Sequence, residues 1–216
     1  MIREMRAAIF DLDGVIVDTA KYHYLAWKRL AGQYGFDFTE ADNERLKGVS
    51  RTQSLEILLE IGGLSPDVAT KTRMATLKNE WYVDYVSRMD ASEILPGAAQ
   101  YLNMIRARGV KIALGSASKN APMILERLAI SQLFDVIVDG NRVSKAKPDP
   151  EVFLRAASEL GTPPASCIVF EDAEAGIQAA LIAGMGAVGV GKPSHLKEAD
   201  MVIAGLYQLV ALEPMP

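Results

Sequence analysis

The chain has 216 residues, of which half are hydrophobic, and its formal net charge is -4. This length suits one α/β domain with an insertion, or two small domains, and is enough to bury a sizeable core. No apolar run could span a bilayer, and the N-terminus lacks the apolar segment and cleavage site of a signal peptide. The single Cys167 excludes an internal disulfide. We therefore expect a cytoplasmic protein with no membrane and no nucleic acid as partner.

The first predicted element is a buried strand at residues 7–10, which leads into Asp11-Leu12-Asp13-Gly14. Open α/β folds bind ligands at the carboxyl ends of their strands, and alternation along a strand would place both carboxylates on one side. Two adjacent carboxylates repel unless a cation or a shared proton relieves them, so the pattern indicates a Mg²⁺ site. A calcium loop that began at Asp11 would need glutamate at its twelfth position, where Tyr22 stands.

The next part of the chain shows helical spacing of apolar residues and no strand pattern. Helices are predicted at residues 20–34, 39–47, 52–60 and 65–89, the last with Ser65 as its N-cap and Pro66 as its first residue. We therefore expect residues 18–90 to form a helical cap, inserted between the first core strand in residues 1–17 and the rest of the core in residues 91–216.

From residue 94 onward, strand and helix patterns alternate. Strands are predicted at residues 110–114, 136–138, 167–170, 187–190 and 201–203, the last at an edge, with helices between them. This alternation predicts an α/β fold with a doubly wound, Rossmann-like parallel sheet that the first strand joins.

Three further turns follow predicted strands and carry polar residues: Ser116 to Asn120, Lys147 before the stiff Pro148, and Glu171-Asp172. Taken singly, the first could be an ordinary N-cap and the second a solvated lysine. Taken together with the first turn, they offer carboxylates for Mg²⁺ and donors for phosphate oxygens at one edge of the sheet. Phosphoryl transfer needs both.

These four turns resemble the motifs of the haloacid dehalogenase superfamily of phosphotransferases, and the resemblance extends along the whole chain. The helical insertion is similar to that of the β-phosphoglucomutases, a cap type that sugar-phosphate phosphatases of the same superfamily share. The segments that carry the resemblance are Phe10 to Val15, Tyr22 to Trp27, Lys47 to Arg51, Ser116 to Asn120, Lys147-Pro148 and Glu171 to Ile177. Gly115 stands where relatives often have alanine, which would loosen this strand end slightly.

In the core, the resemblance implies that Asp11 is the nucleophile that carries an aspartyl-phosphate. Asp13 would be the general acid/base, and its backbone carbonyl would bind Mg²⁺. The side chains of Asp11, Asp172 and Glu171 would complete the metal site. The residues implied to hold the transferring phosphoryl group are Ser116, Ala117, Asn120 and Lys147.

In the cap, the resemblance implies a site for the sugar and its second phosphate. Its residues would be Thr19, His23, Trp27, Gly48, Val49, Arg51, Ser54 and Lys78. The implied reaction interconverts β-D-glucose 1-phosphate and glucose 6-phosphate through the aspartyl-phosphate, with Mg²⁺ as cofactor and glucose 1,6-bisphosphate as intermediate and activator. The alternative is a sugar-phosphate phosphatase with the same core. In either case we expect a monomer that acts on a small sugar phosphate.

Overall fold

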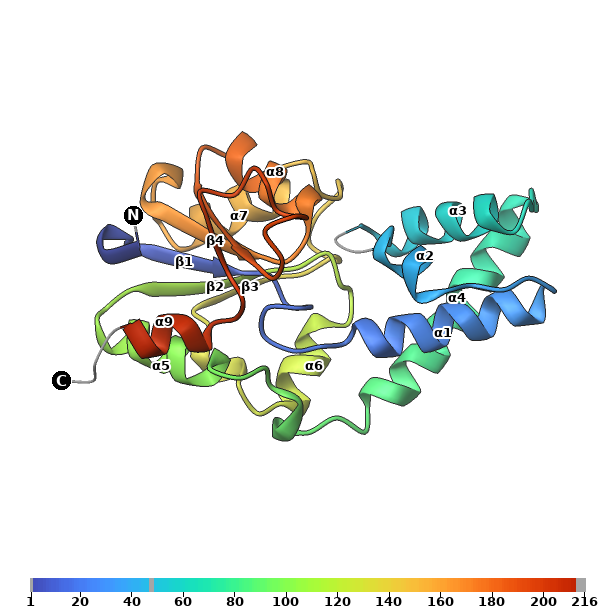
Figure 1. The fold of residues 1–216 in the computed structure, drawn as a ribbon, viewed down its shortest axis with the longest axis horizontal. Coiled ribbons are helices and arrows are strands. Elements are labelled where there is room, and N and C mark those ends of the chain that lie inside the picture. Colours follow the sequence, from blue (N-terminus) through green and yellow to red (C-terminus); the bar gives the residue numbers. More distant parts are fainter. Residues whose placement is uncertain (1, 47–48, 213–216) are drawn as a thin grey trace.

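The computed structural model describes residues 2–46 and 49–212. Its centre is a six-stranded parallel sheet with the order β3-β2-β1-β4-β5-β6 (Figure 1). The strands are β1 (Ala7–Phe10), β2 (Lys111–Gly115), β3 (Val136–Val138), β4 (Cys167–Glu171), β5 (Gly186–Val190) and β6 (Met201–Ile203). This topology confirms the predicted α/β fold, with the first strand inside the sheet and the last at its edge.

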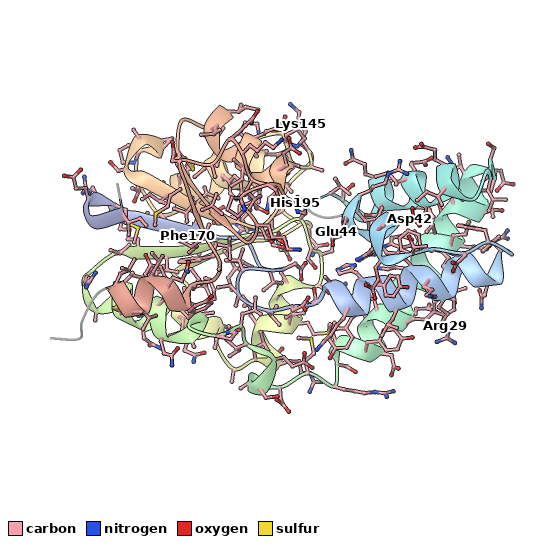
Figure 2. All side chains as sticks on the ribbon, in the orientation of Figure 1. Arg29, Asp42, Glu44, Lys145, Phe170 and His195 are labelled. Atoms are coloured by element: carbon pink, nitrogen blue, oxygen red, sulfur yellow. The ribbon has the colours of Figure 1, made fainter. Side chains whose placement is uncertain are left out.

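Helices cover both faces of the sheet, which explains why β1 is an unbroken apolar run (Figure 1). One face packs on α5 (Ala98–Ala107), α6 (Ala121–Arg127) and α9 (Tyr207–Leu212), and the other on α7 (Glu151–Glu159) and α8 (Glu174–Ile182). Phe10 and Phe170 stack on the first face with ring centroids 4.6 Å apart, and Figure 2 shows Phe170 within this packed core. Short 3₁₀ turns occur at Ile2–Glu4, Ala91–Glu93, Ser131–Leu133 and Pro164–Ser166.

Between β1 and α5 the chain forms a helical insertion that lies to one side of the sheet (Figure 1). Its helices are α1 (Ala20–Gln33), α2 (Glu40–Glu44), α3 (Arg51–Ile61) and α4 (Val68–Val86). Helices α1, α3 and α4 share a separate hydrophobic cluster that includes Trp27, Leu30, Leu58 and Met74. The helical insertion is therefore confirmed, whereas its limits at residues 18 and 90 stay a prediction.

Two connections join the insertion to the core, and they lie side by side. The Leu95 backbone N–H donates to the Ile16 carbonyl at 2.9 Å, and Val17 forms isolated bridges with both Asp13 and Ile94. Backbone hydrogen bonds thus hold the two connecting segments to each other, next to the end of β1. No helix in the described part of the chain is long and apolar enough to cross a membrane.

Several helix ends differ from the sequence-based expectation. Helix α4 begins at Val68 and not at Pro66, because Asp67 is the N-cap and its carboxylate accepts the Thr70 N–H at 2.7 Å. Helix α2 ends at Glu44. The backbone N–H groups of the next two residues, Arg45 and Leu46, donate to carbonyls three positions before them instead of the four of an α-helix. The predicted end at Lys47 lies outside the described residues.

Candidate functional site

The carboxyl ends of β1 and β4 bring three carboxylates together. Asp11 follows β1 directly, Glu171 is the last residue of β4 and Asp172 is next, and the two strands are neighbours in the sheet. One carboxylate oxygen from each residue lies within 4.8 Å of the others. Oxygen donors grouped in this way fit a hard divalent cation such as Mg²⁺.

Asp13 is positioned by the turn and not by strand alternation, because β1 ends at Phe10. Its backbone N–H donates to Asp11 Oδ2 at 3.0 Å, and the buried Thr19 hydroxyl donates to its carboxylate. Burial, followed by the charge of Asp11, raises the pKa of Asp13 to about 8. A carboxyl with this pKa can both give and accept a proton near neutral pH.

Lys147 lies beneath this turn and is buried. Its Nζ is 2.6 Å from Asp11 Oδ1, 2.8 Å from Glu171 Oε2 and 3.2 Å from the Gly115 carbonyl. Burial opposes the charged form, but the charges of Asp11 and Glu171 outweigh it and raise the pKa of Lys147. Burial and the charge of Asp11 raise the pKa of Glu171 to about 8. The lysine thus holds two of the three grouped carboxylates in place.

Two glycines leave the space that these carboxylates occupy. Gly14 has φ +75°, and a Cβ there would lie 2.2 Å from Asp172 Oδ2. A Cβ at Gly176, in the first turn of α8, would lie 2.1 Å from the Glu171 carboxyl carbon. Glycine is required at both positions, since any other side chain would displace a carboxylate.

The turn after β2 supplies hydroxyls and amides at the same edge. Ser116 is buried, and its hydroxyl accepts the Ser118 N–H at 3.1 Å. The Asn120 side chain donates to Asn79 Oδ1 of α4 at 3.0 Å, which links the core turn directly to the insertion. The neighbouring Gly115 is tightly packed, because a Cβ there would lie 2.9 Å from the Phe153 ring.

The insertion contributes a cationic cluster opposite the carboxylates. Lys78 is buried, with its Nζ 2.9 Å from His23 Nδ1 and above the rings of Trp27 and Tyr82. Burial, and then the charge of Arg51, lowers the pKa of Lys78 well below its usual range. Burial, and then the charge of Lys78, lowers the pKa of His23 in the same way. An anion in the pocket would therefore stabilise the charged form of Lys78.

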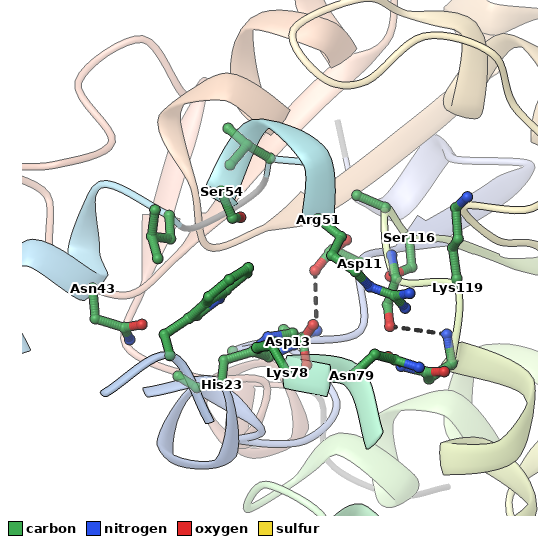
Figure 3. A pocket seen from close by; sticks show the side chains of 18 of the residues that line it. Asp11, Asp13, His23, Asn43, Arg51, Ser54, Lys78, Asn79, Ser116 and Lys119 are labelled. Atoms are coloured by element: carbon green, nitrogen blue, oxygen red, sulfur yellow. Dashed lines mark hydrogen bonds between the residues drawn. The ribbon is translucent and has the colours of Figure 1, made fainter. Parts of the chain in front are cut away.

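Core and insertion face each other across the pocket that Figure 3 shows. The predicted site residues that line it are Asp11, Asp13, His23, Trp27, Val49, Arg51, Ser54, Lys78, Ser116, Ala117, Asn120 and Asp172. Behind this lining, Thr19 contacts Asp13 and Lys147 contacts Asp11. Glu171 in turn contacts Lys147. Gly48 lies outside the described residues. Four other polar side chains that line the pocket have no role predicted from the sequence: Asn43, Asn79, Ser118 and Lys119. Ser118 and Lys119 lie within the segment Ser116 to Asn120, which carries the family resemblance, whereas no sequence pattern marks Asn43 or Asn79.

The fold and this edge of the sheet define a class of protein. Residues 5–184 match the family model described as haloacid dehalogenase-like hydrolase, so the chain belongs to that family. It is 48% identical over 201 residues to a β-phosphoglucomutase of Bacillus subtilis, covering 92% of this chain and 89% of the relative. A phosphorylated carbohydrates phosphatase of Thermotoga maritima is 33% identical, covering 84% and 82%. A solved β-phosphoglucomutase structure from Clostridium difficile superimposes with a TM-score of 0.92 at 45% identity, covering 95% and 93%.

Proposed function

We propose that the protein is a Mg²⁺-dependent phosphosugar mutase that interconverts β-D-glucose 1-phosphate and glucose 6-phosphate. The observation that carries this proposal is the charge arrangement of the pocket, with carboxylates on the core side and Arg51 and Lys78 on the other (Figure 3). A bisphosphate has a phosphate at each end and needs a site for both, whereas a phosphatase needs one. The 48% identity to a β-phosphoglucomutase supports the same function.

Mg²⁺ would be held by the carboxylates of Asp11 and Asp172 and the Asp13 carbonyl, with Glu171 beside them. When bound, it neutralises charge on the transferring phosphoryl group. The grouped oxygens described above fit such an ion. Ser116, Ala117, Asn120 and Lys147 would hold the phosphoryl oxygens.

The reaction takes two phosphoryl transfers. Phospho-Asp11 gives its phosphoryl group to the sugar 6-hydroxyl of β-glucose 1-phosphate, while Asp13 accepts the hydroxyl proton. The resulting glucose 1,6-bisphosphate turns over in the pocket. Asp11 then attacks the 1-phosphate, Asp13 returns its proton to the departing sugar oxygen, and glucose 6-phosphate leaves.

Water must be kept from phospho-Asp11, because hydrolysis would turn the mutase into a phosphatase. The adjacent connections at residues 14–19 and 90–95 are the proposed hinge through which the cap closes over the pocket. Thr19 supports this role, since it ends the first connection as the N-cap of α1 and its hydroxyl donates to the Asp13 carboxylate. Cap closure would therefore move the group that positions the acid/base.

The test is a product assay with β-glucose 1-phosphate, Mg²⁺ and a trace of glucose 1,6-bisphosphate. Glucose 6-phosphate should form in large excess over inorganic phosphate, and the α-anomer should be a poor substrate. Arg51→Ala should reduce mutase turnover far more than hydrolysis of acetyl phosphate. Arg45→Ala is the matched control, because Arg45 is an exposed arginine of the insertion that pairs with Glu60. Release of inorganic phosphate as fast as sugar phosphate is consumed would establish the phosphatase alternative, which the Thermotoga relative represents.

A further inference from the structure

An unpartnered amide lies in the wall of the pocket. Asn43 is only 8% exposed, and its Oδ1 has no hydrogen-bond partner within the part of the chain that the structure describes. Most buried side-chain polar atoms do have a partner, because desolvating one without compensation costs free energy. A buried acceptor that lines a pocket is therefore a candidate for a ligand contact.

The local fold does not use this side chain. Helix α2 is capped by Thr39 and Asp42, which accept each other's backbone N–H groups. Asn43 enters the backbone pattern only through its main chain, with its N–H bonded to the Thr39 carbonyl and its carbonyl to the Leu46 N–H. Replacing the side chain would leave these backbone bonds in place.

The surroundings of Asn43 indicate what it could bind. Figure 3 shows its amide directed into the pocket from the insertion side. Apolar Trp27 and Val49 of the insertion also line the pocket, and the buried Ser54 supplies a second neutral polar group. The cations Arg51 and Lys78 line the same pocket, and Figure 3 shows them apart from Asn43. A mixture of apolar carbon surface and neutral polar groups suits a sugar ring with its hydroxyls better than a phosphate.

We propose that Asn43 Oδ1 accepts a hydrogen bond from a ring hydroxyl of the bound hexose phosphate and so contributes to sugar specificity. This inference rests on the proposed function, because that function places a hexose phosphate in the pocket. A site that leaves a buried acceptor unpaired when the hydroxyl is missing discriminates against the deoxy sugar. Asn43 is thus a binding residue of the cap, separate from the phosphate contacts.

The test compares sugar affinity in wild type and Asn43→Leu, which has a similar volume and no polar atom. The dissociation constants of glucose 6-phosphate and of its 2-, 3- and 4-deoxy analogues are measured by calorimetry. Wild type should bind one analogue about tenfold more weakly than the full sugar. Asn43→Leu should bind the full sugar about tenfold more weakly than wild type does. It should bind that analogue with the same dissociation constant as the full sugar. Gln53→Leu, an exposed amide of α3, is the control and should bind as wild type does.

Thermal unfolding of the unliganded protein separates a binding role from a structural one. Asn43→Leu should unfold at the wild-type temperature or higher, because it removes an unpartnered buried amide. The proposal would be overturned if each deoxy analogue lost the same affinity, relative to glucose 6-phosphate, in Asn43→Leu as in wild type. It would also be overturned if Asn43→Leu unfolded at a lower temperature and bound all the sugars more weakly. Turnover of β-glucose 1-phosphate by wild type is scored separately, so failure of the mutase function is a different result from failure of the Asn43 contact.

Discussion

Replacing Lys147 by methionine tests the electrostatic core of the site. The side chain is 1% exposed and its Nζ contacts two buried carboxylates, Asp11 at 2.6 Å and Glu171 at 2.8 Å. Methionine preserves most of the volume but removes the charge. Removing one partner of a buried ion pair destabilises a protein by about 3–5 kcal/mol. For a chain of this length we expect the Tm to fall by about 10 °C.

The stability that Lys147→Met loses relative to wild type should depend on pH. Burial and Asp11 already raise the pKa of Glu171 from 4.5 to about 8, and without Lys147 it should rise further. A carboxyl whose folded-state pKa lies above its unfolded value contributes stability that is complete below pH 4.5 and is lost as the pH rises through the folded pKa. Below about pH 7 Glu171 is protonated in both folded proteins, so the deficit of Lys147→Met relative to wild type should be nearly constant there. The deficit should grow as the pH rises through 8, because Glu171 then ionises in folded wild type but stays protonated in the folded variant.

Thermal unfolding at several pH values, with and without Mg²⁺, measures both effects. Mg²⁺ should stabilise Lys147→Met more than wild type, because it neutralises the same carboxylates. Lys145→Met is the control, since Lys145 lies at the surface (Figure 2), is 68% exposed and pairs only at 3.2 Å with Asp149. It should stay within about 0.5 kcal/mol of wild type. A Lys147→Met protein as stable as that control at pH 8 would refute the reasoning.

Three further substitutions address single steps of the proposal. Asp11→Asn should abolish turnover with the fold intact, because an amide is a poor nucleophile, and activity within tenfold of wild type would contradict the assignment. Asp172→Ala should strongly raise the Mg²⁺ concentration needed for activity, and full activity in excess chelator would exclude the metal site. Gly115→Ala should lower stability by about 1–3 kcal/mol in denaturant unfolding, because its Cβ would lie 2.9 Å from the Phe153 ring; unchanged stability would mean that this ring moves freely.

The sequence predicts the core better than the cap. The apolar run of β1 and the Asp11 turn follow from local pattern, because a strand buried on both faces tolerates only apolar residues. The start of α4 was predicted wrongly, since Ser65-Pro66 and Asp67 both satisfy the rules for an N-cap and only the structure selects Asp67. Local sequence signals of this kind do not reveal which of two adjacent caps is used.

Contacts between distant segments could not be predicted from pattern. His23 and Lys78 are 55 positions apart, and their pairing depends on how α1 packs against α4. The bond from Asn120 to Asn79 joins residues 41 positions apart, across the pocket. Periodicity identifies each helix but contains no information on which residues of two helices meet.

The division of charge between the two sides of the pocket explains why both parts of the fold are needed. The core side carries the carboxylates of Asp11, Asp13 and Asp172, with Lys147 beneath, and the insertion side carries Arg51 and Lys78. Lys78 has its pKa lowered by burial and by Arg51, while the charge of Asp13 across the pocket raises it. A phosphate between the two sides would stabilise the cations directly, and a metal ion would do the same for the carboxylates. Each side is therefore costly to bury alone, and a substrate with a phosphate at both ends favours bringing them together.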